Sequence, residues 1–393
     1  MNHSSSQKMV MPILLAVSLT HLFNDVIQAV VTAIYPMLKS NYALSFTQIG
    51  LISLAYQITA SLIQPWIGLH TDKFPKPYLL PSGMVITLCG IVALAYAPNF
   101  YVLLLSGVII GLGSAIFHPE ASRVARTASN GHFGTAQAAF QVGGNTGSAL
   151  GPLLVAVWVA QRGQESVLVL IPIALLAIAV LYYISRWTIA YQNRVQATSQ
   201  SHTTYRLQRN ELGRALSIIA LLMVVKFTYI ASLSNYFTFF LIEKFALSLS
   251  QAQLCLFAFM GAVAVGTFAG GPIGDRIGRY TVIWFSFVGM VPFALVLPYA
   301  NLLGTMVCAI GAGLIMSSAF SAMIVYAQEA IPNRVGLISG AMFGFMFGIS
   351  GIGSALLGMW ADKYGIQSIF QFCAYLPLLG VVAWALPKHK VRD

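Results

Sequence analysis

The chain alternates long apolar runs with short polar breaks that contain proline, glycine or charged residues. A helix needs roughly 20 predominantly apolar residues to cross the hydrocarbon core of a membrane. Twelve runs meet this length, and they cover residues 11–38, 47–69, 79–97, 101–122, 135–159, 166–187, 214–241, 251–271, 280–299, 302–327, 336–358 and 366–386. In lipid only helices or closed barrels satisfy the backbone, and these runs are too long and too continuously apolar for alternating barrel strands. The pattern predicts an all-α integral membrane protein with twelve transmembrane helices.

Composition agrees with a membrane protein, because only 8% of the 393 residues are charged and 58% are hydrophobic. An average soluble domain is about a quarter charged. The net charge of +11 raises the possibility of a nucleic-acid partner. When lysines and arginines are counted in alternate loops with the N-terminus inside, however, sixteen face inward and only Lys39, Arg162, Lys244 and Lys363 face outward. This is the positive-inside asymmetry, so the charge predicts two cytoplasmic termini and no nucleic-acid partner.

The chain repeats itself. "GLHTDKFPK" at 68–76 aligns without gaps with "GPIGDRIGR" at 271–279, and "GSAL" at 147–150 recurs at 353–356. A polar stretch at 191–212 separates the copies. We therefore predict two pseudo-symmetric six-helix halves, 1–187 and 214–393, joined by a cytoplasmic linker at 188–213. Duplicated halves of this kind are typical of secondary transporters that work by alternating access.

The repeated loop, G-x-x-x-D-[KR]-x-x-[KR], follows the second helix of each half and resembles the cytoplasmic signature of the major facilitator superfamily. Four further stretches are similar to the bacterial fosmidomycin resistance family within it: "SLTHLFNDVIQAVVTAIYP", "FHPEASRVAR", "FQVGGNTGSALGPLL" and "VYAQEAIP". The resemblance implies a bacterial inner-membrane exporter of small phosphonate antibiotics, coupled to protons, whose helices 1, 4, 7 and 10 line a cavity. In one respect the chain departs from many proton-coupled exporters, since Gly107 stands where they place a helix-4 arginine.

The missing arginine directs attention to other polar residues that could carry a proton. In the first run His21, Asn24, Asp25 and Gln28 are spaced i, i+3, i+4 and i+7, which places them on one helix face. The fourth run ends in a second charge cluster. We predict four proton-coupling residues, with Asp25 the leading carrier and Glu120 second: Asp25, Glu120, His21 and His118. Structural hydrogen bonding by His21, and a gating or interfacial role for the second cluster, remain open alternatives.

A small anion is the predicted substrate, because a charge near the membrane centre is costly and normally faces a cavity. The predicted substrate-binding residues are Lys226, Arg123, Asn24, Gln28, Gln141, Asn145, Tyr229, Tyr236 and Gln328. A purely structural Asp25–Lys226 ion pair is the alternative. Separately, carboxylates at helix ends and nearby cations would hold the cytoplasmic side shut. The predicted gating residues are Asp72, Lys73, Asp275, Arg276, Arg279 and Glu329.

Other function classes lack their motifs. The sequence contains no H-E-x-x-H, no phosphate-binding P-loop and no metal-spaced Cys/His set, so we predict no enzyme, no cofactor and no metal. The predicted partners are the small anion, protons and membrane lipid, with the chain acting as a monomer. Within transporters, an importer or a voltage-driven transporter of an endogenous organic anion or sugar phosphate remains the alternative. A stripe of Gly336, Gly340, Gly344 and Gly348 predicts close helix packing and no chemistry.

Overall fold

The computed structural model describes residues 9–74, 76–130, 133–195, 209–331 and 335–387, and within these ranges every regular element is a helix. The elements of the first part of the chain are α1 (Met11–Ala33), α2 (Tyr35–Asn41), α3 (Phe46–Lys73), α4 (Leu79–Ala95), α5 (Phe100–Ala128), α6 (Phe133–Leu154), η1 (Val155–Val159), α7 (Ala160–Arg162), η2 (Gln164–Val169) and α8 (Leu170–Val195). Those of the second part are α9 (Arg209–Phe245), α10 (Leu249–Ile277), α11 (Arg279–Val288), α12 (Val291–Val296), α13 (Leu302–Ser317), α14 (Ala319–Ala330), α15 (Val335–Tyr364), α16 (Ile366–Cys373) and η4 (Leu376–Ala385).

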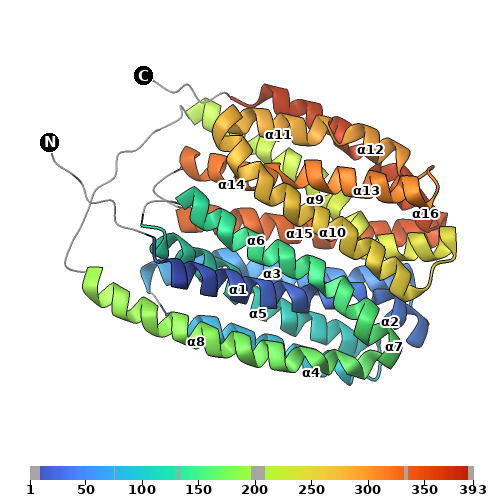
Figure 1. Cartoon of the computed structure of the whole chain (residues 1–393), viewed down its shortest axis with the longest axis horizontal. Coiled ribbons are helices and arrows are strands. Elements are labelled where there is room, and N and C mark those ends of the chain that lie inside the picture. The colour runs from blue at the N-terminus through green and yellow to red at the C-terminus, as the bar shows by residue number, and fades with distance from the viewer. Residues whose placement is uncertain (1–8, 75, 131–132, 196–208, 332–334, 388–393) are drawn as a thin grey trace.

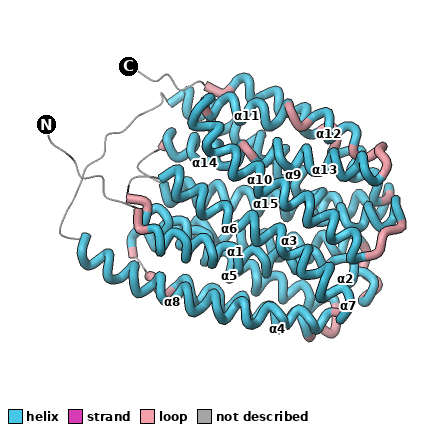
Figure 2. The backbone as a smooth tube through the Cα atoms, in the orientation of Figure 1, coloured by secondary structure: helices cyan, strands magenta, loops and turns pink. Residues whose placement is uncertain are grey.

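The helices form one bundle of long, roughly aligned rods joined by short loops (Figures 1 and 2). Among the described residues, eleven helical segments are long and apolar enough to cross a membrane, and the shorter apolar helix α4 completes the set of twelve. The prediction of an all-α protein with twelve membrane-crossing helices is therefore confirmed. The start of α1 and the end of α8 lie at the same end of the bundle, on the left in Figure 1.

Several crossings are interrupted near prolines, which the apolar pattern alone did not predict. Pro36 stands in the first turn of α2 and Pro292 in the first turn of α12, so each marks a break in a longer crossing. Pro152 lies inside α6 just before the π-helical turn η1, and Pro377 lies in the first turn of η4. Proline lacks a backbone N–H and removes one helical hydrogen bond, which favours a break at these four positions, although α3 and α5 continue past Pro65 and Pro119. Neighbouring helices make such breaks tolerable inside a membrane.

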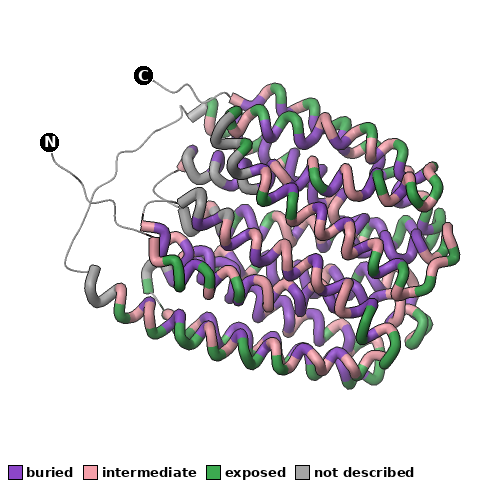
Figure 3. The backbone as a smooth tube through the Cα atoms, in the orientation of Figure 1, coloured by how far each residue is buried: buried purple, intermediate pink, exposed green. Residues whose placement is uncertain are grey.

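The outer surface of the bundle is apolar, as lipid contact requires. In Figure 3 exposed stretches recur on the helices at the edges of the bundle, such as α8, and buried stretches are frequent between them. Leu303 and Trp384 are 75% and 76% exposed, respectively, yet neither is polar. In water such exposure of many large apolar side chains would be unfavourable, whereas in hydrocarbon it is not. The burial pattern is thus that of a protein solvated by lipid on its sides.

The predicted glycine stripe lies where α15 packs along α3. A Cβ atom on Gly344 would come within 2.9 Å of the Ser61 carbonyl oxygen, and one on Gly348 within 2.8 Å of the Ser61 hydroxyl oxygen. Gly340 faces Pro65 of the same helix at ordinary contact distance. The prediction of close packing is therefore confirmed for these three positions, while Gly336 lies outside the residues whose side chains are described. The packing of α15 along α3 joins a helix of the first predicted half to a helix of the second.

The predicted boundaries of the two halves stay a prediction. Helix α8 continues to Val195 and α9 begins at Arg209, so both helices extend into the stretch 188–213 that we expected to be the linker. Residues 196–208, between these helices, lie outside the described residues.

Candidate functional site

A cavity of about 240 Å³ lies between helices of the first and second parts of the chain. The first part contributes a polar wall from α1, α5 and α6, which comprises His21, Asp25, Gln28, His118, Gln141 and Asn145. The second part contributes Lys226 of α9 and a largely aromatic and apolar wall. Aromatic rings line it from both parts, namely Tyr56, Phe227, Phe320, Phe343 and Phe347. A mostly apolar cavity with a few converging polar groups is the usual form of a small-molecule site.

The most concentrated chemistry in the cavity is a cluster of His21, Asp25 and His118. The Nε2 atom of His21 lies 3.4 Å from Asp25 Oδ2, and the Nε2 atom of His118 lies 3.8 Å from Asp25 Oδ1. Asn24 donates a 3.0 Å hydrogen bond to the same Oδ1 atom. Both imidazoles are almost fully buried, at 3% and 2% exposure. Helix α1 supplies two members one turn apart, as the i, i+4 spacing predicted, and α5 supplies the third.

Helix packing fixes the orientation of His21. Its ring stacks on Phe140 of α6 with centroids 4.0 Å apart, and its Nδ1 atom lies 2.8 Å from the Phe140 carbonyl oxygen. Gly144, one turn further along α6, leaves room for this approach. A Cβ atom there would overlap the His21 ring and come within 2.8 Å of Asp25 Oδ2. A glycine on a neighbouring helix is therefore part of the geometry of the cluster.

The hydrogen-bond partners of His21 indicate whether the His21–Asp25 pair can hold a proton. A carbonyl oxygen only accepts, so His21 Nδ1 must donate to Phe140 and carry a hydrogen. If His21 were neutral and Asp25 ionised, the bare Nε2 atom would face a carboxylate oxygen at 3.4 Å, lone pair against lone pair. A shared proton removes that repulsion, whichever atom carries it. The geometry of the pair is therefore suited to one shared proton.

Histidine and aspartate are also metal ligands, and among the described residues the ligand atoms of these three side chains lie within 4.8 Å of one another. A zinc ion holds such atoms at about 2.0–2.2 Å. A proton satisfies the His21–Asp25 pair as it stands. The absence of a metal stays a prediction.

Lys226 lines the same cavity from α9, in the second part of the chain. Its side chain is 2% exposed, and Nζ donates a 2.9 Å hydrogen bond to the Met316 carbonyl oxygen. The rings of Phe320 and Phe227 lie 5.4 and 5.9 Å from Nζ, within the range of cation–π attraction. Within the part of the chain that the structure describes, Lys226 makes no ion pair with a carboxylate. The alternative of a direct Asp25–Lys226 pair is therefore not found in this state.

The other predicted charge cluster lies away from the cavity. Arg123 forms an ion pair with Glu120 on its own helix and donates a hydrogen bond to the Thr71 carbonyl oxygen of α3. Glu120 is 2% exposed, and neither residue lines the cavity. Of the two cations predicted to bind the substrate, Lys226 therefore lines the cavity in this structure and Arg123 does not. The hydrogen bond from Arg123 to Thr71 joins α5 to α3 within the first copy of the repeated sequence at 68–76.

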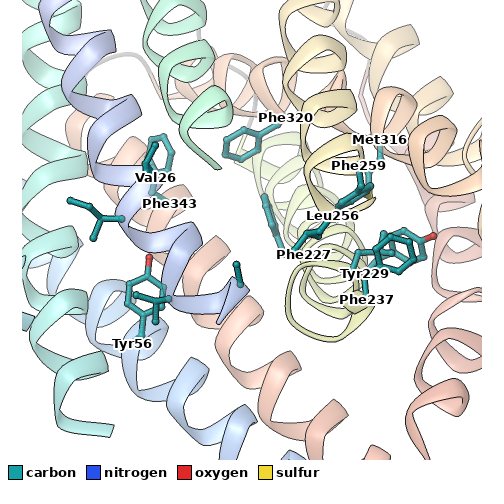
Figure 4. Packing of buried hydrophobic residues seen from close by; sticks show 14 of the residues in the cluster. Val26, Tyr56, Phe227, Tyr229, Phe237, Leu256, Phe259, Met316, Phe320 and Phe343 are labelled. Carbon is teal, nitrogen blue, oxygen red and sulfur yellow. The ribbon is translucent and has the colours of Figure 1, made fainter. Parts of the chain in front are cut away.

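The remaining predicted substrate residues with described side chains divide into two groups. Gln28, Gln141 and Asn145 line the cavity, whereas Asn24, Tyr229 and Tyr236 do not. Tyr236 donates a 2.6 Å hydrogen bond to the Ser354 carbonyl oxygen of α15. Tyr229 is buried, and Figure 4 shows it apart from the cavity residues Tyr56 and Phe343.

Most of the predicted gating residues lie on helices but have side chains that the structure does not describe, namely Asp72, Lys73, Asp275, Arg276 and Glu329. The same holds for Gln328, a predicted substrate-binding residue. Of the predicted gating set, Arg279 alone has a described side chain; it begins α11 and is half-buried. The cytoplasmic gate therefore stays a prediction.

The structure adds a contact that sequence reasoning missed, at the other end of the bundle. Asp362, near the end of α15, accepts hydrogen bonds from the Phe46 and Thr47 backbone N–H groups at 2.8 and 2.7 Å and from the Thr47 hydroxyl at 2.5 Å. A carboxylate is favourable at a helix N-terminus, where the first N–H groups lack partners. The only signal in the sequence was an isolated acid at the end of an apolar run. We call these three bonds the Asp362 clamp.

Comparison with known proteins gives matches over nearly the whole chain. The model of the Major Facilitator Superfamily matches residues 17–241 and 216–393. The chain is 50% identical over 381 residues to the fosmidomycin resistance protein of Escherichia coli (strain K12), covering 97% of this chain and 94% of that protein. It is 38% identical over 392 residues to the uncharacterized MFS-type transporter YfnC of Bacillus subtilis (strain 168), covering 98% and 95%.

A solved structure supports the same fold. The crystal structure of a bacterial homolog of the human lysosomal transporter Spinster, in an inward-facing and unoccupied conformation, superposes with a TM-score of 0.73 at 15% identity. The alignment covers 96% of this chain and 95% of that one. At this identity the likeness concerns the fold alone. Together with the family match and the twelve membrane-crossing helices, it establishes that this chain is a multi-pass membrane transporter, not an enzyme, and that it belongs to the major facilitator superfamily.

Proposed function

We propose that this chain exports small phosphonate-type antibiotics across the bacterial inner membrane, in exchange for protons, by alternating access of one central cavity. The observation that carries the proposal is the 50% identity, over nearly the whole chain, to a protein named for fosmidomycin resistance. The cavity is consistent with such a substrate, because it offers one cation, several amides and an aromatic wall to a small anion. Both termini lie in the cytoplasm in this proposal, as the distribution of lysine and arginine predicts.

Lys226 binds the anionic group of the substrate in this proposal. Its ammonium group is buried, and it has a carbonyl oxygen and two aromatic rings as neighbours instead of a carboxylate. A charge in such surroundings gains strongly from an anion that enters the cavity, because the low dielectric strengthens the attraction. Gln28, Gln141 and Asn145 on the opposite wall provide amide groups that orient the rest of the molecule.

Asp25 carries the exchanged proton, together with His21, and His118 completes the cluster. Glu120 is the second candidate, although its contact with Arg123 lies away from the cavity. Charge alone opposes an exchange mechanism, because a protonated cluster attracts the anion and favours their joint binding. Antiport therefore requires that the empty protein reorients with the proton and the loaded protein reorients without it.

Inside-out membrane vesicles test the direction and the driving force. Respiration acidifies their lumen and makes it positive, so an exporter that exchanges substrate for protons accumulates fosmidomycin inside them. Nigericin, which removes the pH gradient, should abolish this accumulation, whereas valinomycin, which removes the potential, should leave most of it. Accumulation that survives nigericin and is lost with valinomycin would favour the voltage-driven alternative. No accumulation of fosmidomycin under any gradient would refute export.

Lys226→Ala tests the anion site. A charge-assisted hydrogen bond is worth about 1.5–3 kcal/mol, so we expect fosmidomycin affinity to fall by about 10- to 150-fold with unchanged protein level in the membrane. Lys226→Arg should retain part of the affinity. The control is Lys244→Ala on the same helix, whose ammonium group donates to the Pro298 and Ala300 carbonyl oxygens and does not line the cavity. Full affinity in Lys226→Ala would refute this assignment.

A further inference from the structure

A chain of buried hydrogen bonds connects the cavity wall to His118. The Tyr56 hydroxyl donates to Gln28 Oε1, and Gln28 Nε2 donates to the Ser114 hydroxyl at 3.0 Å. The Ser114 hydroxyl oxygen in turn lies 3.2 Å from His118 Nδ1. Tyr56, Gln28 and His118 line the cavity, whereas Ser114 does not and is fully buried. Ser114 therefore lies behind the cavity wall, between Gln28, which a substrate can reach, and His118, which belongs to the cluster with His21 and Asp25.

Ser114 presents both kinds of hydrogen-bonding group to one ring nitrogen. Its hydroxyl lies 3.2 Å and its backbone carbonyl oxygen 3.1 Å from His118 Nδ1. The hydroxyl can donate to a bare nitrogen, and the carbonyl can accept from a protonated one. His21 differs, because its Nδ1 atom has only the Phe140 carbonyl oxygen and must stay protonated. Within the cluster, His118 is thus the imidazole that can change its protonation at Nδ1 without losing its partner.

In this structure Tyr56 donates to Gln28 and Gln28 donates to Ser114. Because the Ser114 hydroxyl oxygen accepts from Gln28, its own hydrogen is available for His118 Nδ1 when that nitrogen is bare. In that arrangement neutral His118 carries its hydrogen on Nε2, the atom that faces Asp25 Oδ1 at 3.8 Å. This arrangement of the hydrogen-bond chain favours neutral His118 and leaves the labile proton on the His21–Asp25 pair.

A bound anion changes this arrangement, because an anion accepts hydrogen bonds and Gln28 Nε2 is a donor at the cavity wall. Once Gln28 donates to the substrate, the Ser114 hydroxyl oxygen is free to accept from a protonated His118 Nδ1. His118 then takes a proton from cavity water at Nδ1 and becomes an imidazolium next to Asp25. That cation stabilises ionised Asp25, and the proton shared with His21 passes to cavity water in turn. One N–H bond forms and one shared proton is lost, so no charge is created.

We propose that Ser114 is a positioning residue that couples occupancy of the cavity to the location of the exchanged proton. The inference rests on the proposed function, since it names the group that holds the exchanged proton when the cavity is occupied; the step moves that proton within the cluster and leaves the number of bound protons unchanged. The ionisable groups that face the cluster are Tyr56 from α3 and Lys226 from α9, across the cavity. Among the described cavity residues, α6 and α15 contribute only neutral side chains.

Nitrogen-15 NMR of histidine-labelled protein in proteoliposomes measures the protonation state of His118 Nδ1. The signal is assigned by its disappearance in His118→Gln. In the wild type, added fosmidomycin should convert this nitrogen from the bare to the protonated form. In Ser114→Ala it should no longer respond, and the pH of half-maximal export should shift by about one unit, the size expected when one buried hydrogen bond to a titrating group is lost. Ser114→Thr, which keeps the hydroxyl, should restore the response.

Ser106→Ala is the matched control. Ser106 lies two turns earlier on α5, is equally buried, and donates to the Leu103 carbonyl oxygen away from the cluster. It should leave the NMR response and the pH profile unchanged. Ser114→Cys, which is close in size but a weak donor, provides a second reading if the alanine variant folds poorly. A wild-type response of His118 in both Ser114→Ala and Ser114→Cys would overturn the coupling role alone, whereas a wild type without pH-driven export would overturn the proposed function itself.

Discussion

Asp362→Asn tests whether the Asp362 clamp helps to hold this conformation. The clamp joins the end of α15 to the start of α3, two helices that belong to different predicted halves. Ser45 also caps α3 through a capping box with Gln48, so the helix start itself does not depend on Asp362. Removing the charge should therefore loosen the contact between the halves and leave α3 intact.

The size of the effect follows from the three bonds. Asparagine retains one carbonyl oxygen, so it can keep one strong acceptor, but it loses the charge and the second carboxylate oxygen. Charge-assisted hydrogen bonds are worth about 1.5–3 kcal/mol when buried, and Asp362 is exposed, so solvent screening reduces each to well below that range. A total loss of about 1–2 kcal/mol corresponds to a shift of about 5- to 30-fold in the equilibrium between clamped and open forms.

Double electron–electron resonance measures that equilibrium. Spin labels on Asn41 and Gln367, both exposed residues near the clamp, report the separation of the two halves once the four native cysteines have been replaced. We expect Asp362→Asn to increase the population with the longer distance, and Glu165→Gln, which removes another exposed acid, to leave the distances unchanged. Identical distance distributions for wild type and Asp362→Asn would refute the clamp as a determinant of conformation.

Three further predictions concern proton coupling and gating. Asp25→Asn should abolish export driven by a pH gradient in proteoliposomes while substrate counterflow survives, and pH-driven export that persists in this variant and in Glu120→Gln would exclude both carboxylates as carriers. Asp72→Asn and Asp275→Asn should lower turnover more than substrate affinity, because a gate changes the populations of states; complete loss of binding by folded protein in detergent would contradict this. Gly144→Ala should abolish pH-driven export, since its methyl group displaces the His21–Asp25 pair, whereas Gly261→Ala, with nothing within 4 Å, should not; normal coupling in the first variant would be the contrary result.

The elements of the fold and one face of the site were predictable from local sequence. Lipid leaves the backbone no alternative to helices, so apolar length alone located the crossings. Helical periodicity placed His21 and Asp25 on one face, and both line the cavity. The same argument put Tyr229 on the side of Lys226, three residues away, yet Tyr229 lies outside the cavity lining. Periodicity gives the relative angle of two side chains, whereas the rotation of the helix against its neighbours decides where the cavity wall ends.

What the sequence by itself determined is therefore what depends on the solvent and on short spacing: twelve helices, a duplicated loop and a His–Asp pair one turn apart. Only the tertiary structure decided which distant groups meet. It brings His118 to Asp25 across 93 positions of the chain, places Ser114 between Gln28 and His118, and engages Arg123 with Glu120 instead of the cavity. The Asp362 clamp spans 315 residues to Thr47. Hydrogen bonds act over about 3 Å in space, and helix packing, not distance along the chain, determines which donors and acceptors come that close.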